Sequence, residues 1–158
     1  MSFRLEKKYE LNSNMYYEFI RYIVSKKANK IHDTRIIYST YFDNDFFSSY
    51  RQSEEGAVPR KKIRIRSYNT LSHQNSAKLE IKISSEENRF KKIENIQSQN
   101  KLKKFLNEGL TDKIYGHCKA TLDVFYEREY YLLNDQRITI DRNITYSRYK
   151  NNKKKVYE

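Results

Sequence analysis

An alternation of isoleucine with basic residues over positions 60–66 constrains the fold of this chain most strongly. The segment reads RKKIRIR. Side chains on a strand point alternately to its two faces, so Lys62, Arg64 and Arg66 share one face and the two isoleucines share the other. Like charges on one face repel each other. The pattern therefore predicts a strand whose charged face is either fully solvated or binds polyanions.

Two further segments show the same alternation, residues 78–83 (KLEIKI) and residues 136–141 (QRITID). Their polar faces carry Lys and Arg with scattered acids. An antiparallel sheet with one charged face normally turns that face to water. A sheet that closes into a barrel instead encloses a polar bore, which must hold water or an anionic ligand. Several such strands together are expected to line a basic channel.

The composition favours a folded protein with a phosphate-rich partner. The 158 residues suffice for one domain with its own core. Lys and Arg exceed Asp and Glu by 32 to 20, giving a net charge of +12, which attracts nucleic acid, nucleotides, polyphosphate or an anionic membrane. Only 3 Gly and 1 Pro argue against a disordered chain, and 15 Tyr favour an all-β or α+β fold.

Cysteine content and hydropathy predict a soluble, cytoplasmic protein. The single cysteine, Cys118, excludes an intrachain disulfide and a cysteine-based zinc site. The N-terminal residues lack the apolar core of a signal peptide, and no apolar run approaches the roughly 18 residues that span a bilayer. The three histidines are isolated in the sequence, so we expect His32, His73 and His117 at the surface.

Periodicity and capping signals predict one α+β domain over residues 1–158, with an antiparallel sheet or barrel and helices at its ends. Strands are expected at 4–11, 35–42, 60–68, 78–83, 89–93, 121–133, 137–141 and 154–158. Helices are expected at 14–25 and 100–107, with a short helix after Asp43. The apolar stripe of the first helix is predicted to pack in the core: Met15, Phe19, Ile20, Ile23 and Val24.

Cations and carboxylates recur together on the predicted strand faces. Two guanidiniums on one face, Arg64 and Arg66, fit bidentate binding of phosphate. Carboxylates among cations have two uses: they neutralise opposite charges on neighbouring strands, or they hold a divalent metal together with phosphate oxygens. The candidates for the second use are Glu6, Glu80, Asp141 and Glu158.

Several segments, taken in order, resemble motifs of the VTC domain, the polyphosphate polymerase branch of the triphosphate tunnel metalloenzymes and CYTH-like proteins. The matching segments are residues 4–9 (RLEKKY), 39–43 (STYFD), 60–68 after Gly56, 79–82 (LEIK) with a basic strand at 89–92, 126–128 (YER) and 137–141 (RITID). Arg4 stands where the CYTH pattern has its first glutamate, which favours the VTC branch.

The resemblance implies an antiparallel tunnel barrel whose bore is lined by basic residues and a few acids. The expected catalytic residues are Arg64, Arg66, Lys82, Arg128 and Arg137. The expected substrate-binding residues are Lys8, Lys62, Lys91 and Tyr126, with Lys91 preferred to Lys92. The expected ligands of Mn²⁺ or Mg²⁺ are Glu158, Glu80, Glu6 and Asp141. Glu158 matches the family's late metal-binding acid, but the lysine and the helix that follow in the family are missing. We therefore expect a fragment or a tunnel that is completed in another way.

The function implied by the resemblance is transfer of the γ-phosphoryl group of ATP to a growing polyphosphate chain. A metal-dependent triphosphatase and a non-catalytic polyphosphate-binding module remain the alternatives. Nucleic acid is a disfavoured partner, because the basic residues alternate with isoleucine on strands and form no helical recognition pattern. Expected ligands are ATP, triphosphate and polyphosphate. A membrane-protein partner, with membrane association through it, is an implication of the family alone.

Overall fold

The computed structural model describes residues 6–70, 72–73, 77–86, 88–150 and 155–156. Its helices are α1 (Ser13–Ser25), α2 (Ser48–Glu54) and α3 (Gln99–Glu108). Its strands are β1 (Asn29–Asp43), β2 (Arg60–Tyr68), β3 (Ala77–Ser84), β4 (Arg89–Ile96), β5 (Leu110–Asp112), β6 (Gly116–Leu133), β7 (Gln136–Arg148) and β8 (Lys155–Val156). The predicted α+β class is confirmed.

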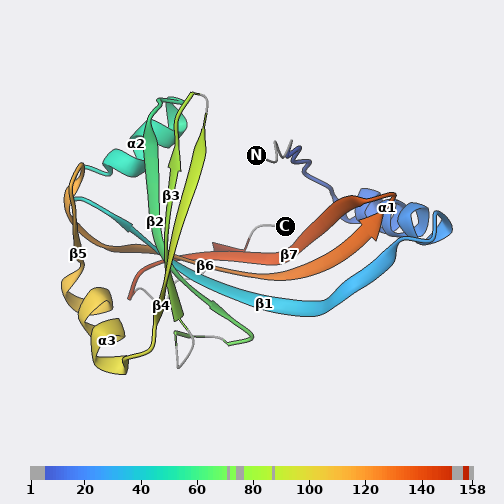
Figure 1. Cartoon of the computed structure of the whole chain (residues 1–158). Coiled ribbons are helices and arrows are strands. Elements are labelled where there is room, and N and C mark those ends of the chain that lie inside the picture. The colour runs from blue at the N-terminus through green and yellow to red at the C-terminus, as the bar shows by residue number, and fades with distance from the viewer. Residues whose placement is uncertain (1–5, 71, 74–76, 87, 151–154, 157–158) are drawn as a thin grey trace.

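All strands belong to one antiparallel sheet with the order β4-β3-β2-β1-β6-β7-β8, and β5 pairs with β6. Figure 1 shows β1, β6 and β7 as a long ribbon that reaches toward α1, while α2, α3 and β5 lie at the opposite end near β2 and β3. We call the end of this ribbon nearest α1 the arm; it contains residues 29–35 of β1, 128–133 of β6 and 136–141 of β7. The predicted turn at Asn134 and Asp135 joins β6 to β7. Their φ values are 48° and 61°, and a type I′ turn of a two-residue β-hairpin requires positive φ at both positions.

The expectation of a closed barrel is wrong for the described residues. Closure requires the two edge strands to pair. Here β4 pairs with β3 and β8 pairs with β7, and in the part of the chain that the structure describes neither edge meets the other. The described part of β8 contains only two residues, so it offers few backbone groups to a further strand. The observed architecture is an open, strongly twisted sheet.

The predicted opening strand over residues 4–11 is also wrong in its described part. Residues 6–11 form neither helix nor strand, and the Tyr9 side chain is 76% exposed. Charge alternation alone cannot hold a strand, because the backbone needs a neighbouring strand for its hydrogen bonds. Arg4 and Leu5 lie outside the described residues.

Helix α1 begins as predicted but buries less of its apolar stripe. Asn12 caps it by accepting a hydrogen bond of 2.9 Å from the backbone N–H of Met15. Ile23 is fully buried, whereas Met15 is 47% and Val24 62% exposed. The rest of the protein covers only a narrow line on this helix.

No helix in the described ranges has both the length and the apolar character needed to cross a bilayer.

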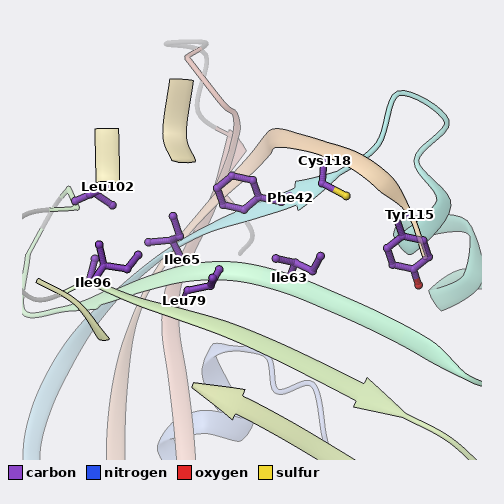
Figure 2. Close-up of a cluster of buried hydrophobic side chains, with 9 residues drawn as sticks. Phe42, Ile63, Ile65, Leu79, Ile96, Leu102, Tyr115 and Cys118 are labelled. Atoms are coloured by element: carbon purple, nitrogen blue, oxygen red, sulfur yellow. The ribbon is translucent and has the colours of Figure 1, made fainter. Parts of the chain in front are cut away.

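The main core lies between α3 and the isoleucine face of β2. Figure 2 shows Ile63 and Ile65 of β2 among side chains from β3, β4 and β6, with Leu102 of α3 beside them. Both isoleucines and Leu102 are at most 2% exposed. The predicted division of β2 into two faces is therefore confirmed, and burial of this apolar face turns Arg64 and Arg66 to the opposite side of the sheet.

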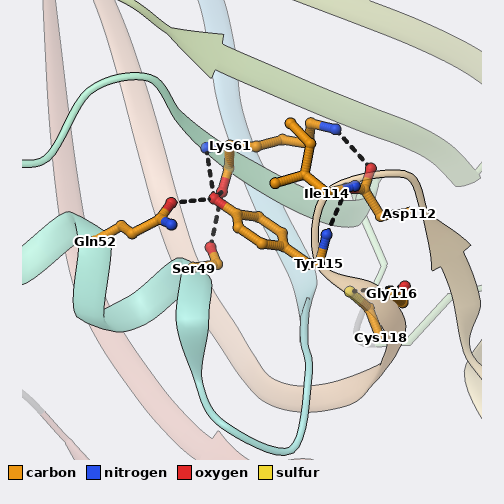
Figure 3. A network of polar contacts seen from close by, with 8 residues as sticks. All are labelled: Ser49, Gln52, Lys61, Asp112, Ile114, Tyr115, Gly116 and Cys118. Carbon is orange, nitrogen blue, oxygen red and sulfur yellow. Dashed lines mark hydrogen bonds and ion pairs between the residues drawn. The ribbon is translucent and has the colours of Figure 1, made fainter.

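One cation of β2 lies on the core side and has its own counter-charge. Lys61 is 8% exposed, and its Nζ is 2.7 Å from Oδ2 of Asp112 in β5. The Tyr115 hydroxyl accepts a hydrogen bond from the Lys61 backbone N–H and donates one to Gln52 (Figure 3). This network joins β2, β5 and α2. The sequence patterns do not predict β5, nor the extensions of β1, β6 and β7 beyond their expected ends.

Candidate functional site

A buried carboxylate surrounded by three cations forms the centre of the charged face. Glu80 of β3 is 3% exposed. Its Oε2 lies 2.6 Å from Nη2 of Arg64 and 3.8 Å from Nη1 of Arg66, and its Oε1 lies 2.8 Å from Nζ of Lys91. We call these four residues the glutamate cluster. It joins β2, β3 and β4 and carries more positive than negative charge.

Strand register explains why these side chains meet. Arg64 stands directly opposite Glu80 in the β2–β3 pair, and Lys91 reaches Glu80 diagonally from β4. Burial alone would raise the pKa of Glu80. The hydrogen bond from Lys91 and the charges of Arg64 and Arg66 outweigh that effect, so the pKa of Glu80 is lowered and its carboxylate is ionised.

A row of three lysines crosses the sheet and includes Lys91 of the cluster. Lys62 stands opposite Lys82, and Lys82 stands opposite Lys91. Like charges directly opposite each other destabilise a strand pair. Loss of water around its ammonium lowers the pKa of Lys82, and the cations Arg89, Lys8 and Arg64 add to this effect against the attraction of Glu6. An anion held between these lysines would relieve the repulsion.

Hydroxyl groups from β1 and β6 hold the two arginines in place. Arg64 donates to the Tyr41 hydroxyl at 2.9 Å. Arg66 donates to Ser39 Oγ at 3.3 Å and to the Tyr126 hydroxyl at 3.2 Å. Ser39 and Tyr41 are absent from the predicted site. The signal was available, because a period of two along β1 puts both on the same face, next to β2.

Arg128 and Asp141 form the next element of the face, along the arm. Arg128 binds Asp141 through two hydrogen bonds, Nε to Oδ1 at 2.5 Å and Nη2 to Oδ2 at 2.6 Å. The guanidinium also lies 5.1 Å from the centre of the Tyr126 ring. Tyr126 therefore contacts both Arg66 and Arg128, and it links this pair to the glutamate cluster.

The remaining predicted site residues lie apart from this group. Arg137 is exposed and stacks on Tyr130 farther along the arm. Glu6 and Lys8 are in the exposed segment before α1, 3.9 Å apart, and their charges act on Lys82. Glu158 lies outside the described residues. The structure thus brings together Arg64, Arg66, Lys82, Lys91, Tyr126 and Arg128, with Lys62 at the edge.

The described carboxylates do not fit a metal site as they stand. Both oxygens of Glu80 are bound to cations, and both oxygens of Asp141 are bound to Arg128. Over the described ranges no three His, Cys, Asp or Glu side chains gather closely enough to hold a metal ion. Glu80 and Asp141 thus serve here as counter-charges for arginine and lysine.

A histidine network lies on the opposite face of the sheet. The prediction of a surface His73 is wrong: its Nδ1 is 2.7 Å from Ser67 Oγ and its Nε2 is 3.0 Å from Thr40 Oγ1, and Thr40 donates to Asp123. Burial lowers the pKa of His73 to about 4. Ser67 and Thr40 have no exposed surface, so neither hydroxyl can reach a substrate. The network is a structural one.

Comparison with known proteins gives one result that covers nearly the whole chain. A family model described as the VTC domain matches residues 3–157. No curated protein matches the chain.

Proposed function

The chain belongs to the VTC domain family, and from this membership we propose that its charged face binds the phosphates of ATP and polyphosphate and catalyses phosphoryl transfer between them. The observation that carries the proposal is the excess of cations on one face. Among the described residues Glu80 is the single acid in contact with Arg64, Arg66 and Lys91, and Lys91 belongs to a row of opposed lysines. Phosphate oxygens are the ligands that such a surface fits best.

The proposed reaction lengthens a polyphosphate chain by one phosphate. A terminal oxygen of the chain attacks the γ-phosphorus of ATP and forms a new P–O bond. The bond between that phosphorus and the bridging oxygen breaks, and its electron pair leaves with ADP. This chemistry needs little covalent help from the protein, because positioning and charge stabilisation of the transferred group supply most of the catalysis.

The contacts suggest a division of roles within the face. Hydroxyl groups hold the guanidiniums of Arg64 and Arg66 in a fixed orientation, and we propose that these two residues bind the phosphates before transfer. Lys82 and Arg128 flank them, and we propose that they neutralise the charge that develops on the transferred group. Lys62, Lys91 and Tyr126 add contacts to the substrate, and Lys8 approaches from the segment before α1.

A divalent cation is part of the proposal through the substrate. Mn²⁺ or Mg²⁺ bound to phosphate oxygens would reduce the charge repulsion between ATP and the acceptor chain. Glu158 is the proposed protein ligand, since both oxygens of Glu80 and of Asp141 are already engaged by cations.

Removal of single cations tests the binding site. We expect Arg66→Ala to weaken binding of tripolyphosphate by about tenfold or more, because a charge-assisted hydrogen bond contributes about 1.5–3 kcal/mol. Lys62→Gln, an exposed position whose change leaves the fold intact, is expected to weaken it less but in the same direction. Isothermal titration calorimetry measures both. Arg51→Ala removes an equal charge from exposed α2 and serves as the control. Unchanged affinity in both site variants would show that the site is elsewhere.

Products distinguish the three functions that share this site. The protein is incubated with ATP and Mn²⁺, with EDTA in a parallel sample, and the products are separated. Polyphosphate and ADP indicate the proposed polymerase, inorganic phosphate alone indicates a triphosphatase, and tight binding of polyphosphate without turnover indicates a binding module.

A further inference from the structure

A hydrogen-bonded bridge lies directly behind the residue pair that holds Arg66. Ser39 of β1 stands opposite Arg66 of β2, and the guanidinium donates to the serine hydroxyl on the charged face. The next residue along each strand, Thr40 of β1 and Ser67 of β2, turns its side chain to the opposite face. His73, from the connection between β2 and β3, bonds to both of these hydroxyl groups, at 3.0 Å through Nε2 and at 2.7 Å through Nδ1.

The hydrogen bonds of this bridge run in one direction and define the form of the imidazole. Thr40 donates its hydroxyl proton to the Asp123 carboxylate, so the threonine oxygen accepts from Nε2–H of His73. Nδ1 then carries no proton and accepts from the Ser67 hydroxyl. Burial lowers the pKa of His73 to about 4, so the ring is neutral at neutral pH and keeps this arrangement.

The bridge fixes the two strands against each other at the Ser39–Arg66 pair. In the register of β1 and β2, Thr40 and Ser67 lie on either side of this pair, one residue along each strand. A link between their hydroxyl groups therefore crosses the pair diagonally on its buried side. Neither residue has exposed surface, so bulk water cannot replace the imidazole as their partner.

The guanidinium of Arg66 is sensitive to the position of its strand, because its own contacts are long. It donates to Ser39 at 3.3 Å and to Tyr126 at 3.2 Å, and it lies 3.8 Å from Oε2 of Glu80. At these lengths a small shift of β2 against β1 is enough to break the hydrogen bonds. Arg64 is held more firmly, by hydrogen bonds of 2.6 Å and 2.8 Å to Glu80 of β3.

We propose that His73 is a positioning residue for Arg66: it holds β1 and β2 together from the buried side and thereby fixes the guanidinium on the charged face. The inference rests on the proposed function and adds to it a residue that never touches the substrate. The effect is directed at one cation, since Arg64 depends mainly on its bonds to Glu80.

A double-mutant cycle in affinity tests this role. Tripolyphosphate is titrated at neutral pH into the wild-type protein, His73→Phe, Arg66→Ala and the double variant. Phenylalanine keeps a ring at this position but removes both hydrogen bonds, so we expect His73→Phe to weaken binding by about fivefold. In the Arg66→Ala background the same change is expected to alter the affinity by less than about twofold, because the residue through which it acts is gone.

Two further variants and one spectroscopic signal distinguish positioning from a general loss of stability. Asp112→Asn removes the partner of buried Lys61 and shows whether destabilisation alone weakens binding. Ser67→Ala removes one hydrogen bond of the bridge and takes the place of His73→Phe if that variant folds poorly. The NMR signal of the Arg66 Nε–H group in the ligand-free protein is identified by its absence in Arg66→Ala. We expect this signal to be sharp in the wild type and in Asp112→Asn, and broadened in both bridge variants.

The outcomes separate the positioning role from the proposed function. An unchanged Arg66 signal in His73→Phe and Ser67→Ala overturns the positioning role. An equal loss of affinity from His73→Phe with and without the Arg66 side chain also overturns it, and so does an affinity that both bridge variants leave unchanged although Arg66→Ala weakens it. The proposed function survives each of these results if Arg66→Ala alone weakens binding. If Arg66→Ala leaves the affinity unchanged while its signal broadens in His73→Phe, the positioning role stands and the assigned phosphate site is wrong.

Discussion

At the scale of single residues, Glu80 decides how the charged face is arranged before a ligand arrives. Its carboxylate contacts Arg64, Arg66 and Lys91, which would repel one another without it. The glutamate therefore fixes the positions of these cations, while their excess charge remains available to phosphate. A group that holds its neighbours in place in this way lowers the entropy cost of binding.

Glu80→Gln is expected to lower the free energy of unfolding by about 1–3 kcal/mol in the absence of ligand, since three cations lose their common counter-charge. The stabilisation by tripolyphosphate is expected to exceed that of the wild-type protein, because phosphate then supplies the missing charge. The folded-state pKa of Glu80 is lowered, so its contribution is present above the ordinary glutamate pKa and is lost as the pH falls. The difference between wild type and variant is thus expected to shrink in acid.

Urea unfolding at neutral and acidic pH, with and without tripolyphosphate, measures these effects. Glu54→Gln, at an exposed position of α2, is the matched control. A Glu80→Gln protein as stable as the control at neutral pH would contradict the assigned role.

At the scale of elements, β2 carries cations toward both sides of the sheet. Arg64 and Arg66 point to the charged face, and Lys61 points to the core side, where Asp112 of β5 meets it. Burial would raise the pKa of Asp112, but hydrogen bonds from Lys61 and from the backbone N–H groups of Ile114 and Tyr115 outweigh it and lower the pKa. The three-residue strand β5 is thereby tied to β2.

Asp112→Asn is expected to destabilise the fold by about 3 kcal/mol, because it leaves the buried Lys61 ammonium without a counter-charge. The amide oxygen retains an acceptor for the backbone N–H groups of Ile114 and Tyr115. The double variant Lys61→Met, Asp112→Asn is expected to recover part of the loss, as no buried charge remains. Chemical denaturation of the three proteins tests this, with tripolyphosphate affinity expected to stay unchanged on the opposite face. Equal stability of the single variant and the wild type would refute the role of the ion pair.

At the scale of the whole molecule, the net charge of +12 attracts any polyanion. A preference for phosphate chains over nucleic acid depends on how the charges are arranged. The cations of the glutamate cluster lie on one face of the sheet, where hydroxyl groups hold the guanidiniums of Arg64 and Arg66. A diffuse positive surface would not distinguish phosphate chains from nucleic acid, whereas a compact face built on strands favours dense phosphate charge.

Thermal unfolding with tripolyphosphate, ATP and a short oligonucleotide, each with Mn²⁺ or EDTA, measures that preference. We expect tripolyphosphate to raise the melting temperature more than an oligonucleotide of equal charge at about 0.15 M salt. The salt dependence alone does not discriminate, since binding of either polyanion weakens as salt is added. Equal shifts with all polyanions would show that the charge acts only as a diffuse surface property.

The amino-acid sequence by itself determined the local features of this protein. The bounds of β2, its two faces and the turn after β6 follow from period-two alternation and from turn residues, which act over a few positions. The tertiary structure decided which faces meet. Ser39 joins Arg66, Lys61 meets Asp112, and Arg137 stacks on Tyr130 away from the glutamate cluster. Alternation states which side of a strand a residue occupies but not which strand lies beside it or how the sheet twists. For the same reason the family resemblance implied a closed barrel, and charge alternation predicted an opening strand, that the described residues do not form: both depend on pairing between distant segments.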